Sequence, residues 1–208
     1  MRQTMRKTSF VGPADLVLAR VLLLGTLLGA ATVALVVPVA QWLTGGPLRW
    51  QTDVGSGEPL PASLLRPRPG VRLTWAGDLG VSIDRAGTGL WLLSLLPGLL
   101  LTVAVALVVT QLLRLTGRVR RGAAFDAGSV RSLQVVALTL VVGTPVIAGV
   151  AGVANARILD RALVEGPHSF LLLSSGQVVL VVTGLVVAVV ADAFAQGRRL
   201  ADDVAGLV

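Results

Sequence analysis

The sequence contains no cysteine and few charged residues, and each absence excludes a class of protein. Without cysteine, the chain has neither a disulfide framework nor a thiolate metal site. Only 14% of the 208 residues are charged and 54% are hydrophobic, whereas soluble domains carry about 25% charged residues. Together with a mean hydropathy of +0.81, this composition indicates an integral membrane protein rather than a soluble domain.

The sequence also lacks the motifs of common catalytic sites. It holds no HExxH metalloprotease motif, no GxxxxGKS/T phosphate-binding loop and no GxSxG nucleophile elbow. Its apolar runs contain no paired carboxylates, and the one histidine, His168, cannot make a closed metal site without other ligands nearby. We therefore expect no catalytic residues, no metal and no cofactor, and we predict that the protein is not an enzyme.

Four apolar runs reach the length of about 18 to 20 residues that is needed to cross the hydrocarbon core. Because the bilayer offers no water to the backbone, each run must be helical. Trp42 and Trp91 close the first two runs at positions where indoles prefer the membrane interface. We predict an all-α membrane fold, a four-transmembrane-helix bundle that forms one integral membrane domain in a lipid bilayer over residues 1–208. The predicted spans are residues 16–43, 89–113, 133–154 and 170–195.

The distribution of arginine predicts the orientation. The N-terminal segment, the loop 114–132 and the tail 196–208 are dense in cations, whereas the loop 44–88 mixes its arginines with acids. Because cations stay on the cytoplasmic side, both termini are predicted to be cytoplasmic. All cations except Lys7 are arginine, a usage typical of GC-rich bacteria, so we place this multi-pass protein in a bacterial inner membrane. We therefore interpret the arginines behind the net charge of +7 as topology signals that flank the spans, and we expect no direct nucleic-acid binding.

The predicted outer loop, residues 44–88, carries an extracytoplasmic β-hairpin. Residues 70–75 and 79–84 each alternate apolar and polar side chains, with the turn sequence AGD between them. Residues 48–50 could add a third strand. Because so short a loop cannot build a sufficient core alone, the hairpin must lean on the membrane surface, on residues 157–169 or on a partner.

Small and polar residues within the spans are the next candidates. Gly25 with Gly29, and Gly149 with Gly152, permit close helix packing, either within the chain or in a homo-oligomer.

The intramembrane polar candidates are Asp192, Gln177 and Asn155. Asp192 is the only acid well inside a span, and we interpret it as an interfacial carboxylate paired with Arg198 or Arg199. The two amides, with the proline and glycines of the third span, motivate an alternative function as a transporter subunit or small-solute carrier.

Two segments that follow the second and fourth spans resemble each other. RRGAAFDAGSVRSL (residues 120–133) and AQGRRLADDVAGLV (residues 195–208) both place a glycine three positions before a large apolar residue. The chain could therefore be two copies of helix, outer loop, helix and inner amphipathic segment, although so short a match also arises by chance.

The same segments resemble the bacterial four-span membrane family called domain of unknown function 2975. The sequence that carries the resemblance is GxxF after the second span and FxxGxxLxxD at the end of the chain, where the family's usual acidic pair is replaced by ADD. The resemblance implies a partnership with a helix-turn-helix regulator of the Cro type, which is often encoded beside the family, and it implies no catalytic residues. The candidate partner-binding residues are Gly122, Phe125, Phe194, Gly197, Leu200 and Asp203.

We therefore predict a non-enzymatic membrane protein that senses or sequesters a cytoplasmic regulator. Its docking surface would be the loop 114–132 together with the tail. The alternative for the tail is an interfacial end that stops the fourth span from sliding through the bilayer.

Overall fold

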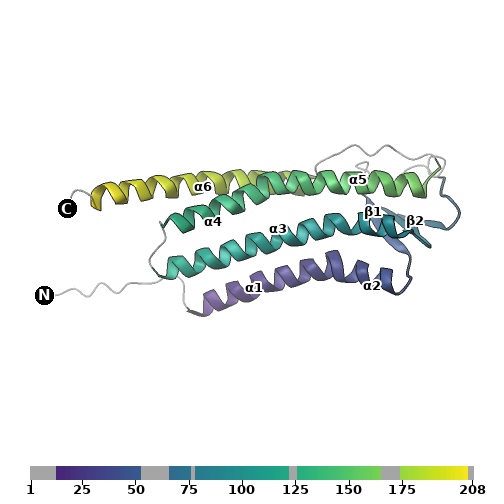
Figure 1. Ribbon diagram of the computed structural model, residues 1–208, viewed down its shortest axis with the longest axis horizontal. Coiled ribbons are helices and arrows are strands. Elements are labelled where there is room, and N and C mark those ends of the chain that lie inside the picture. Colours follow the sequence, from purple (N-terminus) through teal and green to yellow (C-terminus); the bar gives the residue numbers. More distant parts are fainter. Residues whose placement is uncertain (1–12, 53–65, 76–77, 122–125, 165–173, 206–208) are drawn as a thin grey trace.

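A computed structural model describes residues 13–52, 66–75, 78–121, 126–164 and 174–205. It contains long helices and one small sheet (Figure 1). Along the chain the elements are α1 (Pro13–Ala31), η1 (Thr32–Val36), α2 (Val37–Leu43), β1 (Leu48–Thr52), β2 (Val71–Trp75), β3 (Leu79–Ile83), α3 (Thr88–Arg120), α4 (Ala127–Leu138), η2 (Thr139–Gly143), α5 (Thr144–Ala162) and α6 (Ser175–Ala205).

Four continuous helical segments are long and apolar enough to cross a membrane. They confirm the predicted all-α membrane fold. In the first of these segments, no residue of the most apolar stretch is buried by the protein. Such exposure of valine and leucine suits a helix whose solvent is lipid. Numbered as spans one to four, the segments are Arg20–Leu43, Thr88–Val119, Ala127–Ala162 and Ser175–Arg199.

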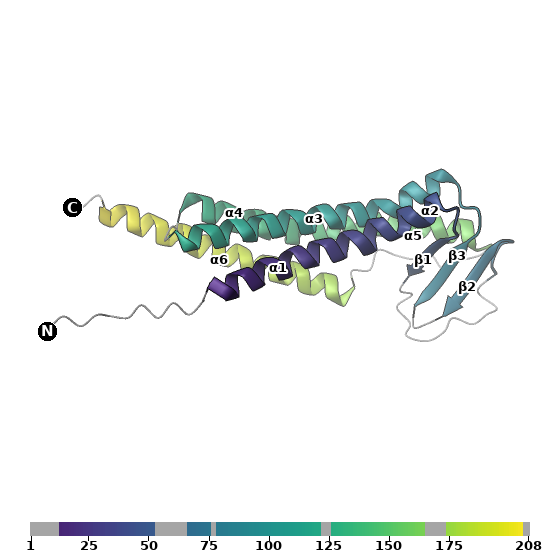
Figure 2. The ribbon, with the colours of Figure 1, turned by 90° about the horizontal axis from the view of Figure 1, so that it is seen from below.

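The spans pack in chain order, as a row rather than a closed ring. Helix α1 packs on α3, α3 packs on α4 and α5, and α4, η2 and α5 pack on α6 (Figure 1). The most extensive helix packing joins α4 and α6. Span one begins and span four ends at one end of the row, which we call the terminal end, and the sheet lies at the opposite end, the sheet end (Figure 2).

The helices continue well past the apolar runs. Helix α3 has 33 residues, about 50 Å at a rise of 1.5 Å per residue, against a hydrocarbon core of about 30 Å. Much of the predicted loop 114–132 is therefore helical, as the end of α3 and the start of α4. The predicted loop 157–169 likewise begins as helix, because α5 runs on to Ala162. Hydropathy locates the end of an apolar run but not the end of the helix, because polar residues can continue the same helix beyond the run.

The hairpin predicted from residues 70–75 and 79–84 is present as β2 and β3, and β1 is the third strand. The sheet is antiparallel with the order β1-β3-β2. Trp50 and Leu73 flank Val81 across the sheet. The side of the membrane on which the sheet lies stays a prediction.

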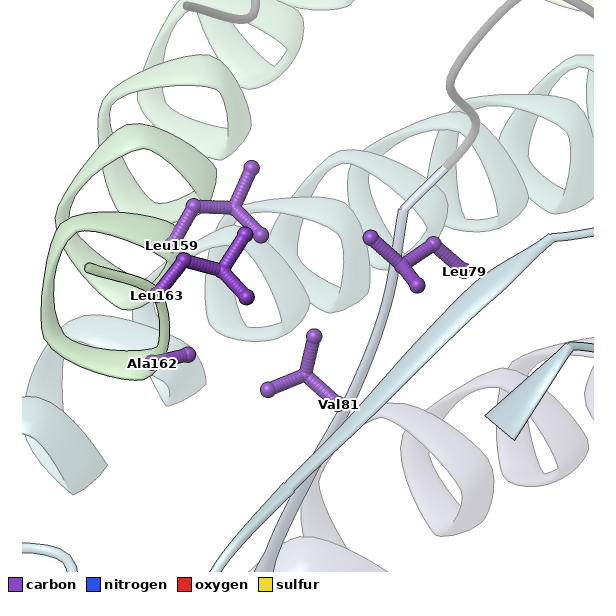
Figure 3. Packing of buried hydrophobic residues seen from close by; sticks show 5 residues of the cluster. All are labelled: Leu79, Val81, Leu159, Ala162 and Leu163. Atoms are coloured by element: carbon purple, nitrogen blue, oxygen red, sulfur yellow. The ribbon is translucent and has the colours of Figure 1, made fainter. Parts of the chain in front are cut away.

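The sheet packs on the C-terminal end of α5, so the hairpin leans on the protein itself. Figure 3 shows Leu79 and Val81 of β3 pointing toward Leu159, Ala162 and Leu163. All five side chains are at most 2% exposed, and together they form a hydrophobic core at the sheet end, where span three ends.

A short extended segment fastens this end of α5. Pro67 and Leu163 form an isolated antiparallel bridge. The backbone N–H of Arg68 donates to the carbonyl of Ala162 at 2.9 Å, and its side-chain Nε donates to the carbonyl of Leu163 at 3.1 Å. A cation thus satisfies a carbonyl at the negative end of the helix dipole.

Spans one and three each contain a π-turn, and each π-turn precedes a proline. The turn η1 ends two residues before Pro38, and η2 ends two residues before Pro145. Because proline lacks an N–H and its ring crowds the preceding turn, the helix widens there. The first residues of the two turns, Thr32 and Thr139, each donate a hydroxyl hydrogen bond at 2.8 Å to the carbonyl four residues earlier.

Each π-turn also faces a glycine of the following span. A Cβ added to Gly98 of span two would lie 2.3 Å from the carbonyl oxygen of Ala34 in η1. A Cβ added to Gly184 of span four would lie 2.7 Å from Cβ of Leu140 in η2. The two halves of the chain therefore share a π-turn, a proline and a facing glycine, which supports the predicted internal repeat from residues other than those that suggested it.

Candidate functional site

At the terminal end, the side chain of Arg118 joins α3 to α4. Its Nη1 donates to the carbonyl oxygen of Gly128 and, at 2.8 Å, to Oγ of Ser132. The Ser132 hydroxyl in turn donates to the Gly128 carbonyl at 3.0 Å. A Cβ added to Gly128 would lie 2.6 Å from Cζ of Arg118, so this glycine makes room for the guanidinium. Sequence analysis treated Arg118 only as a topology signal and missed this role.

The predicted partner-binding residues are only partly described. Phe194 and Gly197 lie half-buried on α6, and Leu200 and Asp203 belong to the last two turns of the same helix. Gly122 and Phe125 lie outside the described residues. The meeting of the two amphipathic segments therefore stays a prediction.

Exposed cations gather on the helices of the terminal end. Around Arg118, arginine side chains project from the ends of α3 and α6 and from the first half of α4. The exposed members of this set, which we call the basic rim, are Arg114, Arg121, Arg131, Arg198 and Arg199.

The predicted pairing of Asp192 with an arginine is wrong. Asp192 is exposed, and its Oδ2 accepts a hydrogen bond at 3.1 Å from Nε2 of Gln196. Gln196, four residues on, lies one turn away on the helical face of Asp192. Arg198, six residues on, lies on another face, and Arg199, seven residues on, lies two turns away. Among the described residues, Asp192 makes no salt bridge.

The two intramembrane amides both have structural partners. Oδ1 of Asn155 accepts a hydrogen bond at 3.0 Å from Nε1 of Trp50, which ties β1 to α5. Oε1 of Gln177 accepts from the backbone N–H of Ser174 at 2.9 Å, and the Ser174 hydroxyl accepts from the Gln177 N–H at 3.4 Å. This reciprocal pair is a capping box at the start of α6, a motif that the sequence analysis overlooked.

The glycines predicted for helix packing are mostly not the ones that pack. Among the described residues, a Cβ built at Gly25, Gly29 or Gly149 would meet no atom within 4 Å. Gly152 is half-buried in α5. Gly98 and Gly184 make the close contacts instead, because spacing alone does not say which face of a helix meets its neighbour. The homo-oligomer alternative for the first three glycines stays a prediction.

The sheet end holds a pocket of about 960 Å³ between the sheet, the start of α3 and the second half of α5. Four arginines line it with a single acid, and its apolar wall is formed by leucine and valine. From the sequence, Arg68 and Arg85 belong to the loop 44–88, where arginines are diluted among acids, and Arg157 and Arg161 belong to a separate short loop. The four-residue spacing of Arg157 and Arg161 could have indicated that they share a helical face. The charged lining residues are Arg68, Arg85, Arg157, Arg161 and Asp160.

A second, apolar groove of about 570 Å³ lies between η1 and α3. It shares Gly89 and Leu93 with the arginine-lined pocket. Nearby, Trp42 and Trp91 stack with their ring centroids 6.4 Å apart and an interplanar angle of 19°, so the two indoles predicted for one interface do meet.

Comparison with known proteins assigns a family without assigning an activity. Residues 59–206 match the family described as "Protein of unknown function (DUF2975)". No curated protein and no solved structure matches the chain.

Proposed function

This chain belongs to the DUF2975 family of proteins of unknown function, and we propose that it is a non-enzymatic membrane protein whose terminal end binds a cytoplasmic regulatory protein. The observation that carries the proposal is the projection of α3, α4 and α6 beyond their apolar stretches at one end. Helix α6 alone has 31 residues, about 46 Å at 1.5 Å per residue, which exceeds the hydrocarbon core by roughly 15 Å.

The construction of this end supports a docking role. The contact of Arg118 with Gly128 and Ser132 fixes the angle between α3 and α4, so the basic rim stands on connected helices. In α4, Ser129, Ser132 and Leu133 are buried, which leaves Arg131 on the outer face. A rigid, arginine-rich surface favours an acidic partner and orients its approach.

The family resemblance suggests the partner, a small helix-turn-helix regulator encoded nearby. In this proposal, the membrane protein holds the regulator at the cytoplasmic face of the bilayer and away from DNA. A signal that reaches the other side would then act by changing the arrangement of the helices.

Retention of the regulator at the membrane tests the proposal. The intact protein is co-expressed with a helix-turn-helix regulator of the kind that the family resemblance implies, and the fraction of regulator in washed membranes is measured. The triple variant Arg114→Glu, Arg121→Glu, Arg131→Glu should lower the affinity by roughly 5-fold to 100-fold, because each exposed ion pair contributes about 0.2 to 1 kcal/mol and reversal adds repulsion. The matched control is Arg49→Glu with Arg72→Glu on the sheet, which should retain the regulator as the parent does.

Two results would remove the proposal. One is a regulator that stays soluble beside the unaltered protein, and the other is equal retention by the rim variant and its control.

A transporter subunit remains the alternative function, although two of the residues that motivated it now have other roles. The amide of Asn155 binds Trp50, and that of Gln177 caps α6. Solute flux into proteoliposomes that depends on the protein would favour this alternative.

A further inference from the structure

The arginine-lined pocket and the apolar groove at the sheet end lie next to each other and differ in chemistry. The pocket combines an apolar wall with four arginines and one aspartate, whereas the groove is lined by leucines and Gly89 and holds no charged side chain. We propose that they form one binding site for an anionic phospholipid. The phosphate headgroup lies in the arginine-lined pocket, and one acyl chain of the same lipid lies in the groove.

The charge balance of the pocket calls for an anion. Four arginines face one aspartate there, and all five side chains are exposed. Among the described residues, none of Arg85, Arg157 and Arg161 forms a salt bridge. Guanidinium groups bind phosphate oxygens through paired N–H donors, and a phosphate would add the negative charge that one aspartate does not supply to four arginines.

Two of the arginines have a distinctive relation to the backbone. Nε of Arg68 donates to the Leu163 carbonyl, which holds its guanidinium at the end of α5. Arg85 has a φ of 57°, a left-handed conformation that residues other than glycine rarely adopt. Backbone strain of this kind persists where the surrounding structure holds the residue in that conformation, and strained residues are concentrated at binding sites.

The start of α3 adds backbone donors on the same side. Gly87 precedes the helix as its N-cap, and because glycine has no side chain, no side-chain hydrogen bond caps the first amide groups of α3. Ala86, Gly87 and Gly89 line the pocket, so the first amide groups of a 33-residue helix lie beside the arginines. Helix N-termini favour anions, which strengthens the preference set by the guanidinium groups.

The apolar groove favours an anion that carries an acyl chain. Leu35 of η1 and Leu92, Leu96 and Leu99 of α3 line it within the membrane-spanning segments, and Gly89 and Leu93 belong to both sites. Inorganic phosphate would occupy only the pocket, whereas a lipid occupies both. The stacked pair Trp42 and Trp91 lies at the same end, where indoles mark the level of lipid headgroups.

Gly89 offers a way to separate headgroup binding from chain binding. A Cβ built there meets no atom of the described residues within 4 Å, so the position is open where a larger side chain would begin. Gly89→Leu should fill the junction and exclude the acyl chain while leaving the arginines in place.

Native mass spectrometry of the full-length protein in detergent tests the site. The protein is titrated with phosphatidylglycerol, with phosphatidylcholine of the same acyl chains, and with inorganic phosphate. We expect one tightly held phosphatidylglycerol per chain and weaker binding of phosphatidylcholine by tenfold or more. The double variant Arg157→Gln, Arg161→Gln should weaken phosphatidylglycerol about tenfold, because each exposed charge pair contributes up to about a fivefold effect.

Two matched variants complete the design. Gly89→Leu should weaken phosphatidylglycerol and leave the response to inorganic phosphate unchanged. Arg198→Gln with Arg199→Gln, at the terminal end, should bind phosphatidylglycerol as the parent does. All the arginines replaced are exposed, and thermal unfolding of each variant checks that the fold is intact.

Three outcomes would overturn the proposal. They are equal binding of the two phospholipids, unchanged phosphatidylglycerol binding by the Arg157 and Arg161 variant, and displacement of the lipid by inorganic phosphate with no effect of Gly89→Leu. The last result would assign the pocket to a soluble anion. None of these outcomes depends on the regulator, because the two proposals concern opposite ends of the molecule.

Discussion

Gly98 provides a quantitative test of how spans one and two are held together. Replacing it with alanine would place a Cβ 2.3 Å from the carbonyl oxygen of Ala34 and 3.3 Å from the Ala34 Cβ. The first contact involves backbone, which cannot rotate away, so η1 and α3 must move apart. Overpacking of this kind costs about 1 to 3 kcal/mol.

The gain in helix propensity opposes this cost. Alanine is favoured over glycine in a helix by about 1 kcal/mol, so the expected net destabilisation from Gly98→Ala is about 0 to 2 kcal/mol. Gly25→Ala is the matched control, because its new Cβ would meet no described atom within 4 Å and keeps the full propensity gain. The two variants should therefore differ by about 1 to 3 kcal/mol, with Gly98→Ala the less stable.

Reversible unfolding in mixed micelles measures the difference. Two of the four tryptophans, Trp42 and Trp91, stack between spans one and two and place part of the fluorescence signal there. Equal free energies of unfolding for Gly98→Ala and Gly25→Ala would refute the claim that η1 and α3 touch at Gly98.

Three further predictions follow from individual contacts. Arg118→Gln should speed hydrogen exchange in the first turn of α4, because the guanidinium bond to the Gly128 carbonyl is lost; unchanged exchange there would exclude the bridge. Ser174→Ala should destabilise the first turn of α6 by about 1 kcal/mol, seen as faster local exchange with none at the far end of the helix. The natural chain has no cysteine, so single variants Gln51→Cys and Arg131→Cys report orientation: an impermeant maleimide added to intact cells should label the first alone, and the reverse pattern would invert the topology.

The number and type of the membrane elements could be predicted from sequence because hydropathy is a local property. A long apolar run predicts each span. Alternating apolar and polar residues predict strands β2 and β3, since successive side chains of a strand face opposite sides of the sheet. The ends of the helices could not be predicted in this way. Residues 114–120 and 155–162 carry polar side chains, but they extend existing helices and pack on neighbours.

The candidate sites were harder to predict, because they depend on which helix faces meet. The sequence indicates an intramembrane amide at Asn155, yet β1 places Trp50, 105 residues earlier in the chain, beside it. Gly25 and Gly29 fit a packing motif, but a Cβ built at either one meets no atom of the described residues within 4 Å, whereas Gly98 makes a close contact without any motif. The arginine-lined pocket joins residues from three separate segments, and only the folded chain reveals their proximity.

The hydrophobic core between the sheet and α5 constrains the order in which the protein can mature during translation. Leu79 and Val81 emerge from the ribosome with the first half of the chain, but Leu159, Ala162 and Leu163 come with the second. Until span three is inserted, the apolar face of the sheet lacks the α5 residues that cover it in the folded protein. Exposed apolar surfaces of this kind bind chaperones and promote aggregation. Maturation of the sheet therefore waits on insertion of span three, and a defect in that late step would leave an early segment unfolded.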